Sequence, residues 1–168
     1  MSITLVTGGQ RSGKSTYAMN LAKSLAEKPV YLATSRCWDE EYKKRIDRHK
    51  AQRESGWINI EEELYLSNCD VKGKVVVIDC VTLWCTNFFF DNKSDVDLSL
   101  KLLKDEFDKT AAIEADFIFV TNEIGMGGVS DNLIQRKFTD LQGWINQYIA
   151  SKADHVVMMV CGIPLKVK

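Results

Sequence analysis

The sequence has few of the residues that mark disordered, disulfide-bonded or zinc-binding proteins. Its 168 residues include only 2 prolines, while 45% are hydrophobic and 27% are charged, which excludes a disordered or collagen-like chain. The 5 cysteines are odd in number and show no C-x-x-C spacing, and with only 2 histidines they make a poor zinc set. We therefore expect buried, reduced thiols in a cytoplasmic protein.

Excess charge and long apolar runs are also missing. The 22 basic and 23 acidic residues give a net charge of −1. The surface as a whole therefore has no excess of positive charge to attract nucleic acid, and we expect no nucleic-acid partner. No basic run precedes an apolar stretch at the N-terminus, so we expect no signal peptide. No apolar run approaches the roughly 20 residues of a membrane span. The length fits a single nucleotide-binding domain over residues 1–168 that needs no structural metal or disulfide.

Five short apolar runs alternate with helical patterns along the chain. The runs are nearly continuous in Val, Ile, Leu and Phe, as in strands buried on both faces of a parallel sheet. They are Ile3–Val6, Val30–Ala33, Val75–Asp79, Phe117–Thr121 and Val156–Val160. Helical spacing follows Ser15, spans Leu100–Ala111 and begins again near Asn132, with Ser130 or Asp131 as its expected cap. This alternation predicts a doubly wound α/β fold with a mostly parallel sheet and helices on both faces.

A glycine-rich motif follows the first predicted strand and opens the first helix. It fits G-x-x-x-x-G-K-[ST] and consists of Gly8, Gly9, Gln10, Arg11, Ser12, Gly13, Lys14 and Ser15. The glycines let backbone N–H groups surround phosphate oxygens, and the helix dipole favours negative charge there. Lys14 would reach the β- and γ-phosphates and the Ser15 hydroxyl would ligate Mg²⁺. The motif predicts a P-loop NTPase-like domain that binds a nucleoside triphosphate.

A second carboxylate is expected near the metal, at the end of a neighbouring strand. Asp79 ends the run Val75–Asp79 and is our candidate, with a solvated strand-end aspartate as the alternative. Glu123 follows the next predicted strand and is a second candidate. Because ligands bind at the carboxyl ends of strands in such folds, both residues are placed for this role.

A basic helical segment carries one of the two histidines. Arg45, His49 and Arg53 are spaced four apart and would share one helix face. Flanking guanidinium groups disfavour the imidazolium form, which leaves a ring nitrogen free to attack a phosphorus. The residues alone leave the alternative open that His49 lies on a solvated basic surface. His155 has no such neighbours and resembles a turn residue.

These motifs occur in the order of a known family. The chain resembles the bifunctional adenosylcobinamide kinase / adenosylcobinamide-phosphate guanylyltransferase family of cobalamin biosynthesis, nearly end to end. Besides the phosphate loop and the histidine segment, the resemblance rests on Ala33-Thr34-Ser35, Val120-Thr121-Asn122-Glu123, Gly125-Met126-Gly127 and Gly162-Ile163.

The resemblance implies two reactions and their site residues. A triphosphate phosphorylates adenosylcobinamide, and GTP then donates GMP to the phosphate, giving adenosyl-GDP-cobinamide and pyrophosphate through a guanylyl-histidine at His49. It implies GTP as substrate, ATP as a further candidate for the kinase step and a homotrimer, while the phosphate-loop motif predicts Mg²⁺ as cofactor. Nucleotide contacts carry over to the phosphate loop and to Ala33, Thr34, Ser35, Lys50, Ala51, Gln52, Arg53, Glu61 and Thr82.

Two other functions remain as alternatives. A plain P-loop kinase would lack guanylyl transfer, which the intact His49 and Arg53 argue against. A GTP-binding switch protein would need a guanine-reading Asn-Lys-x-Asp motif, which follows none of the predicted strands. The sequence departs from the family at Thr139, Trp144 and Pro164, which concerns corrinoid contacts or a subunit interface rather than the phosphate loop.

Overall fold

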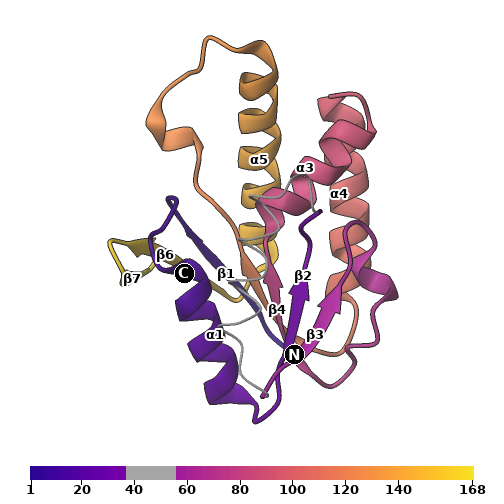
Figure 1. Cartoon of the computed structure of the whole chain (residues 1–168), viewed down its shortest axis with the longest axis vertical. Helices are drawn as coiled ribbons and strands as arrows, with labels where there is room; N and C mark the ends of the chain where they lie inside the picture. The colour runs from indigo at the N-terminus through magenta and orange to yellow at the C-terminus, as the bar shows by residue number, and fades with distance from the viewer. Residues whose placement is uncertain (37–55) are drawn as a thin grey trace.

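A seven-stranded sheet forms the centre of the molecule in a computed structural model that describes residues 1–36 and 56–168. The strand order is β3-β2-β4-β5-β1-β6-β7 (Figure 1). All neighbouring strands are parallel except β6 and β7, which form an antiparallel hairpin. The strands are β1 (Ile3–Gly8), β2 (Val30–Ala33), β3 (Ile58–Glu61), β4 (Val75–Asp79), β5 (Asp116–Val120), β6 (His155–Val160) and β7 (Ile163–Lys166).

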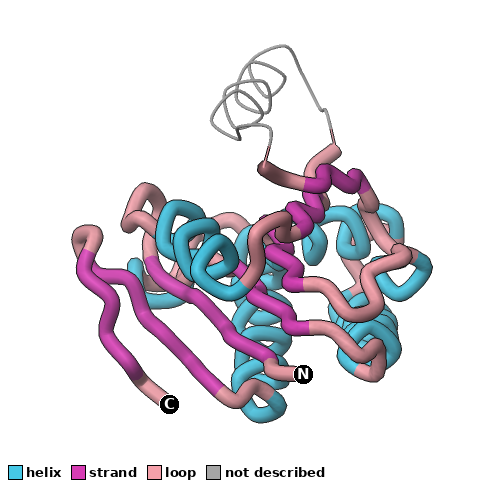
Figure 2. Tube along the Cα trace, turned by 90° about the horizontal axis from the view of Figure 1, so that it is seen from below, coloured by secondary structure: helices cyan, strands magenta, loops and turns pink. Residues whose placement is uncertain are grey.

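Helices cover both faces of this sheet. On one face lies α1 (Lys14–Leu25), whose Ala18 and Ala22 pack in a cluster with Val77 of β4. The other face is covered by α3 (Val81–Asp91), α4 (Val96–Ala111) and α5 (Leu133–Lys152), with two short 3₁₀ turns, η1 (Leu66–Asn68) and η2 (Gly125–Gly127). Figure 2 shows the sheet between these two helical layers. The predicted α/β fold, with a mostly parallel sheet and helices on both faces, is confirmed.

The expected strands agree with the structure to within two residues, but three elements were missed. Every residue of β7 is exposed, and β3 alternates between exposed and half-buried residues, so neither has the continuous apolar run of a central strand. The helix α3 is apolar on most sides and gives no helical stripe. The predicted cap of α5 was also wrong, because Asn132 takes this position and its side chain accepts a hydrogen bond from the Gln135 N–H.

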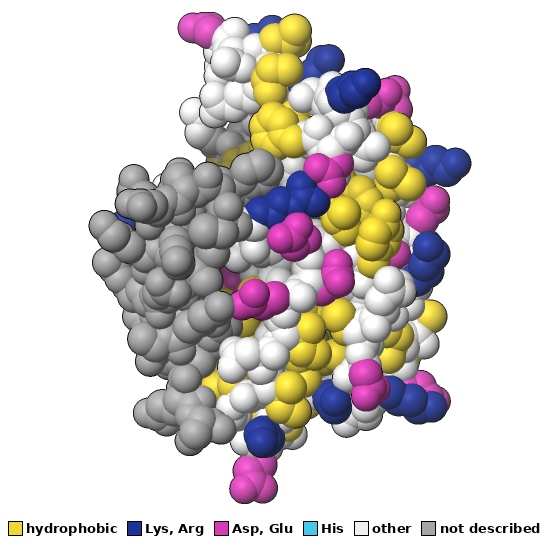
Figure 3. Space-filling model, turned by 45° about the vertical axis from the view of Figure 1, so that its right-hand side comes forward, with side chains coloured by type: hydrophobic (Ala, Val, Ile, Leu, Met, Phe, Trp, Pro, Cys, Tyr) yellow, Lys and Arg dark blue, Asp and Glu magenta, His cyan; other side chains and the backbone are white. Residues whose placement is uncertain are grey.

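The surface charge, the helices and the cysteines agree with most of what the composition predicts. Charged side chains of both signs are interspersed among apolar ones on the face shown in Figure 3. None of the helices in residues 1–36 and 56–168 is both long and apolar enough to cross a membrane. The described cysteines are unpaired; Cys80 and Cys85 are buried as expected, and Cys69 is half-buried. The expectation of buried thiols was wrong for Cys161, which is exposed because it lies in the turn between β6 and β7.

Candidate functional site

The phosphate loop connects the end of β1 to the start of α1. Gly8 adopts φ 146° and lies so close to β6 that an added Cβ would stand 2.6 Å from the Met159 carbonyl oxygen. Gly13 caps α1 with φ 94°, a left-handed conformation that favours glycine. The β6–β7 turn supports the loop from outside, because the Gly162 N–H donates to the Ser12 carbonyl at 3.0 Å. Gly8 and Gly13 therefore occupy positions where a side chain would strain or displace the loop, whereas Gly9 faces open space.

Lys14 begins α1 and folds back over its own loop. Its ammonium group donates to the Gly9 carbonyl and, at 3.4 Å, to the Ser12 hydroxyl. Burial lowers the pKa of Lys14, and this effect is opposed by the nearby Cys80 and Asp79 groups. The ammonium group is therefore held at the loop and close to the strand-end carboxylate, where an anionic phosphate would complement it.

The ends of three adjacent strands bring predicted site residues into one row. Ala33 of β2 pairs in register with Glu61 of β3 on one side and with Asp79 of β4 on the other. Thr34 then joins β2 to β4, because its hydroxyl donates to the Cys80 carbonyl at 2.8 Å and accepts from the Cys80 N–H at 2.9 Å. The row lies at the carboxyl edge of the sheet, where the phosphate loop also begins.

The buried side chain of Asn87 holds the segment after β2 against α3. Its amide nitrogen donates to the Thr34 carbonyl at 2.8 Å and to the Glu63 carbonyl at 2.9 Å. Arg36 adds a second link, with a paired hydrogen bond to Asp91 at 2.7 Å and one to Glu63 at 2.6 Å. The bonds from Arg36 lower the pKa of Asp91. Sequence reasoning missed these contacts, because the partners are far apart along the chain.

The oxygen donors at this edge fit Mg²⁺. Ser15 lies in the first turn of α1, and the half-buried Asp79 shares the sheet face that α1 covers, with its Oδ2 accepting a 2.6 Å hydrogen bond from Tyr31. Within residues 1–36 and 56–168, no three His, Cys, Asp or Glu side chains group to hold a metal. A hydroxyl and one carboxylate suit Mg²⁺, which usually takes its remaining ligands from water and substrate phosphates.

Thr82 and Glu123 both lie beside the loop but already have partners. The Thr82 hydroxyl accepts from the Asn122 N–H at 2.9 Å, which ties the first turn of α3 to the end of β5. The Glu123 N–H donates to the Gly8 carbonyl at 3.0 Å, while its carboxylate accepts from the Gly125 N–H at 2.9 Å. Of the two candidate carboxylates, Asp79 is the one that acts on the Lys14 ammonium group.

Part of the predicted site lies outside the described residues. This part comprises His49, Lys50, Ala51, Gln52 and Arg53. The other predicted residues are described: Ser35 lies in the segment after β2, and Glu61 ends β3. The phosphate loop and the ends of β2, β3 and β4 therefore lie along the same edge of the sheet, with β5 between β1 and β4. Thr82 contacts the end of β5 through Asn122.

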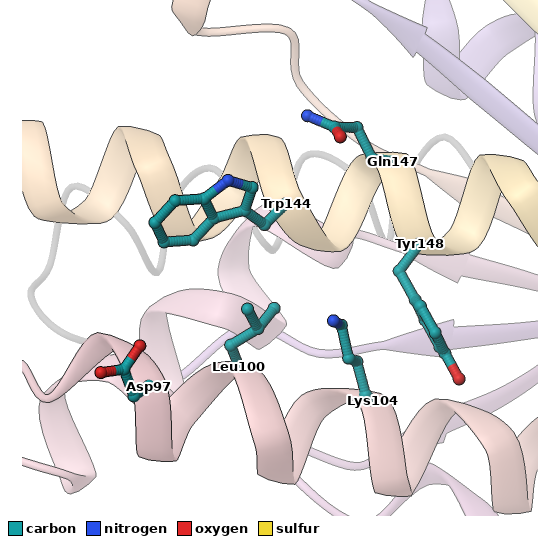
Figure 4. Close-up of a pocket in the computed structure, with 6 residues that line it drawn as sticks. All are labelled: Asp97, Leu100, Lys104, Trp144, Gln147 and Tyr148. Atoms are coloured by element: carbon teal, nitrogen blue, oxygen red, sulfur yellow. The ribbon is translucent and has the colours of Figure 1, made fainter.

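A separate groove of about 510 Å³ runs between α4 and α5. In Figure 4, side chains of the two helices face each other across it, with the Trp144 indole and Leu100 on opposite sides. None of the predicted site residues within 1–36 and 56–168 lines this groove. It lies on the sheet face opposite α1 and is not part of the candidate nucleotide site.

Comparison with known proteins connects this geometry to a family. The family model described as cobinamide kinase / cobinamide phosphate guanyltransferase matches residues 4–167. The chain belongs to this family. It is therefore an enzyme of cobalamin biosynthesis with kinase and guanylyltransferase activities, and its substrates include a nucleoside triphosphate. The family and function predicted from the sequence are confirmed.

Relatives of this cobinamide kinase / guanylyltransferase family match the chain over nearly its whole length. The bifunctional adenosylcobalamin biosynthesis protein CobU of Escherichia coli (strain K12) is 36% identical over an alignment of 185 residues. This alignment covers 98% of each chain. The bifunctional protein CobP of Pseudomonas aeruginosa is 34% identical over 170 residues, covering 98% of this chain and 96% of that protein. The crystal structure of flagellar accessory protein FlaH from Methanocaldococcus jannaschii matches with TM-score 0.48 and 13% identity, over 99% of this chain and 78% of that one.

Proposed function

We propose that the carboxyl edge of the sheet binds GTP and that His49 carries its GMP to adenosylcobinamide phosphate. The observation that supports this site is the row formed by Glu61, Ala33 and Asp79, in which Asp79 lies near the Lys14 ammonium group. In this proposal the phosphate loop and the segment after β2 contact the nucleotide. The family relationship and the His49–Arg53 motif support the histidine step.

Guanylyl transfer proceeds in two displacements. A ring nitrogen of His49 attacks the α-phosphorus of GTP, the bond to the β-phosphate oxygen breaks, and pyrophosphate leaves. A phosphate oxygen of adenosylcobinamide phosphate then attacks the phosphorus of guanylyl-His49, which frees the histidine and forms adenosyl-GDP-cobinamide. The Lys14 ammonium group and the loop N–H groups offset the charge that develops on the leaving pyrophosphate.

The kinase step uses the same loop. The hydroxyl of the aminopropanol arm of adenosylcobinamide attacks the γ-phosphorus of a triphosphate, GTP or ATP, and the nucleoside diphosphate leaves. Lys14 offsets charge on the transferring phosphoryl group. Ser15 and Asp79 would hold Mg²⁺, which when bound neutralises charge on the phosphate oxygens.

Labelling with α-labelled GTP tests the histidine step. The purified chain is incubated with labelled GTP and Mg²⁺ without corrinoid, and acid-labile label is mapped. We expect label on His49 that adenosylcobinamide phosphate discharges. His49→Ala should lose both the label and GMP transfer but keep the phosphorylation of adenosylcobinamide. His155→Ala removes the only other histidine of the sequence and should label like the parent.

The outcomes separate the proposal from its alternatives. A His49→Ala chain that transfers GMP at the parental rate would exclude His49 as the nucleophile. Phosphorylation without label or GMP transfer in the parent would indicate a plain kinase. Slow hydrolysis of GTP without any acceptor would indicate a switch protein.

Three broader expectations belong to the same proposal. Residues 1–168 act as one nucleotide-binding domain in the cytoplasm, which the unpaired thiols of Cys80 and Cys85 support. The chain forms a homotrimer, and the exposed apolar residues Ile163 and Leu165 on β7 offer a surface for contact between copies. Light scattering measures the assembly, and a monomer mass would contradict the trimer.

A further inference from the structure

A tyrosine–carboxylate hydrogen bond lies within the candidate metal site. The Tyr31 hydroxyl donates to Asp79 Oδ2 at 2.6 Å. Tyr31 lies on β2 beside β4, two residues before the Ala33 that pairs with Asp79, so both side chains are on the α1 face of the sheet. The Tyr31 ring is 4% exposed and packs edge-to-face on Trp57, with ring centroids 6.0 Å apart.

We propose that Tyr31 is a positioning residue that orients the Asp79 carboxylate toward Mg²⁺. This inference rests on the proposed function, in which Asp79 serves the metal. It assigns Tyr31 a role in metal affinity rather than in contact with the substrate.

The geometry supports this role because the donor is rigid. A strand-end carboxylate rotates freely unless a partner fixes it, whereas the Tyr31 ring is held by β2 and by the buried Trp57. The phenol has one proton and donates it to Oδ2, which leaves Oδ1 of Asp79 available for the metal or a water bound to it.

The neutral charge of the donor is equally important. Asp79 already lies near one cation, Lys14. A lysine or arginine as its hydrogen-bond partner would offset more of its negative charge and weaken its attraction for Mg²⁺. A phenol orients the carboxylate while leaving its full negative charge. Groups that orient metal ligands in this way typically contribute about 10- to 100-fold in metal affinity.

The chain supplies a matched control for the loss of this hydrogen bond. Tyr148 of α5 donates to Asp108 of α4 at 2.7 Å, in an exposed position on the opposite side of the sheet. Tyr31→Phe and Tyr148→Phe each remove one phenol hydroxyl that donates a hydrogen bond to an aspartate. Only Tyr31→Phe removes this hydrogen bond from the candidate metal site.

Nucleotide affinity measured at varied Mg²⁺ concentration tests the proposal. A fluorescent GTP analogue is titrated into the parent, Tyr31→Phe, Tyr148→Phe and Asp79→Asn chains, with Mg²⁺ and with EDTA. We expect Tyr31→Phe to raise the half-saturating Mg²⁺ concentration about tenfold while leaving affinity in EDTA unchanged. Tyr148→Phe should match the parent, and Tyr31→Phe should add nothing in an Asp79→Asn background.

The outcomes distinguish this inference from the proposed function. If Asp79→Asn leaves the Mg²⁺ dependence unchanged, the metal role of Asp79 is wrong and the inference fails with it. If Asp79→Asn raises the Mg²⁺ requirement but Tyr31→Phe behaves like Tyr148→Phe, the role of Tyr31 alone is wrong.

A second measurement keeps the Tyr31 hydroxyl in place. The parent chain is labelled with 3-fluorotyrosine, and fluorine NMR spectra are recorded with bound nucleotide before and after Mg²⁺ is added. We expect one tyrosine resonance to shift on Mg²⁺ addition and to stay fixed in Asp79→Asn. Absence of any such shift in the parent would overturn the inference even if Tyr31→Phe failed to fold.

Discussion

Replacing Thr34 by valine should destabilise the edge of the sheet that carries the site. Valine keeps the shape of this fully buried side chain but removes the hydroxyl that joins β2 to Cys80. The Cys80 carbonyl retains a bond from the Trp84 N–H at 3.0 Å, whereas the Cys80 N–H loses the partner that the structure gives it. One orphaned donor costs about 1–3 kcal/mol and one lost further bond about 1 kcal/mol, so we expect a loss of roughly 2–4 kcal/mol.

Thr34→Ser is the matched control. Serine keeps both hydrogen bonds and removes one buried methyl group, which costs about 0.5–1.5 kcal/mol by analogy with Ile→Val changes. Urea unfolding measures both variants, and the valine variant should show the lower midpoint with an unchanged slope. In thermal unfolding it should lose roughly 5–15 °C in Tm. Equal stability of the two variants, or a more stable valine variant, would refute the reasoning.

Two further predictions concern the phosphate loop. Burial lowers the pKa of Lys14 below the usual 10.5, so its positive charge is lost as the pH rises through this lowered pKa. Above the lowered pKa, GTP affinity should fall by up to tenfold per pH unit. Affinities measured from pH 7 to 10 should fall less in Lys14→Arg, and parallel profiles would contradict the assignment. Gly8→Ala should weaken GTP binding at least tenfold, because its Cβ would stand 2.6 Å from the Met159 carbonyl oxygen. Gly9→Ala meets nothing within 4 Å and should bind GTP like the parent, so equal losses in the two variants would exclude this steric explanation.

Local sequence signals predicted the centre of the fold and the phosphate loop. The central strands are continuous apolar runs, and the loop has fixed glycines at fixed spacing, so each can be recognised within a few residues. Edge strands lack such a signal, which is why β3 and β7 were missed. The apolar stripe of α5 was also recognised, but its cap was predicted wrongly. Ser130, Asp131 and Asn132 can all cap a helix and follow one another, so the sequence pattern does not distinguish Asn132, the cap in the structure, from its neighbours.

Contacts within the site depend on pairs that no local pattern reveals. Tyr31 and Asp79 are 48 positions apart, and Arg36 and Asp91 are 55 positions apart. The register of β2 against β4 brings the first pair together, and the packing of α3 brings the second. Sequence reasoning could name Asp79 as a candidate, because it ends a strand, but not the phenol that bonds it.

The position of β1 constrains the order in which the site can form. This first strand lies between β5 and β6, and the loop that follows it is held by Gly162, so its strand partners are all synthesised long after it. Contacts so distant along the chain make folding slow, because long loops must close before these contacts form. In a growing polypeptide, β1 would therefore emerge from the ribosome without its neighbouring strands, and the phosphate loop would lack its hydrogen bond from Gly162. The nucleotide site is thus completed only after β5 and β6 have been synthesised, and until then the exposed apolar surface of β1 favours aggregation.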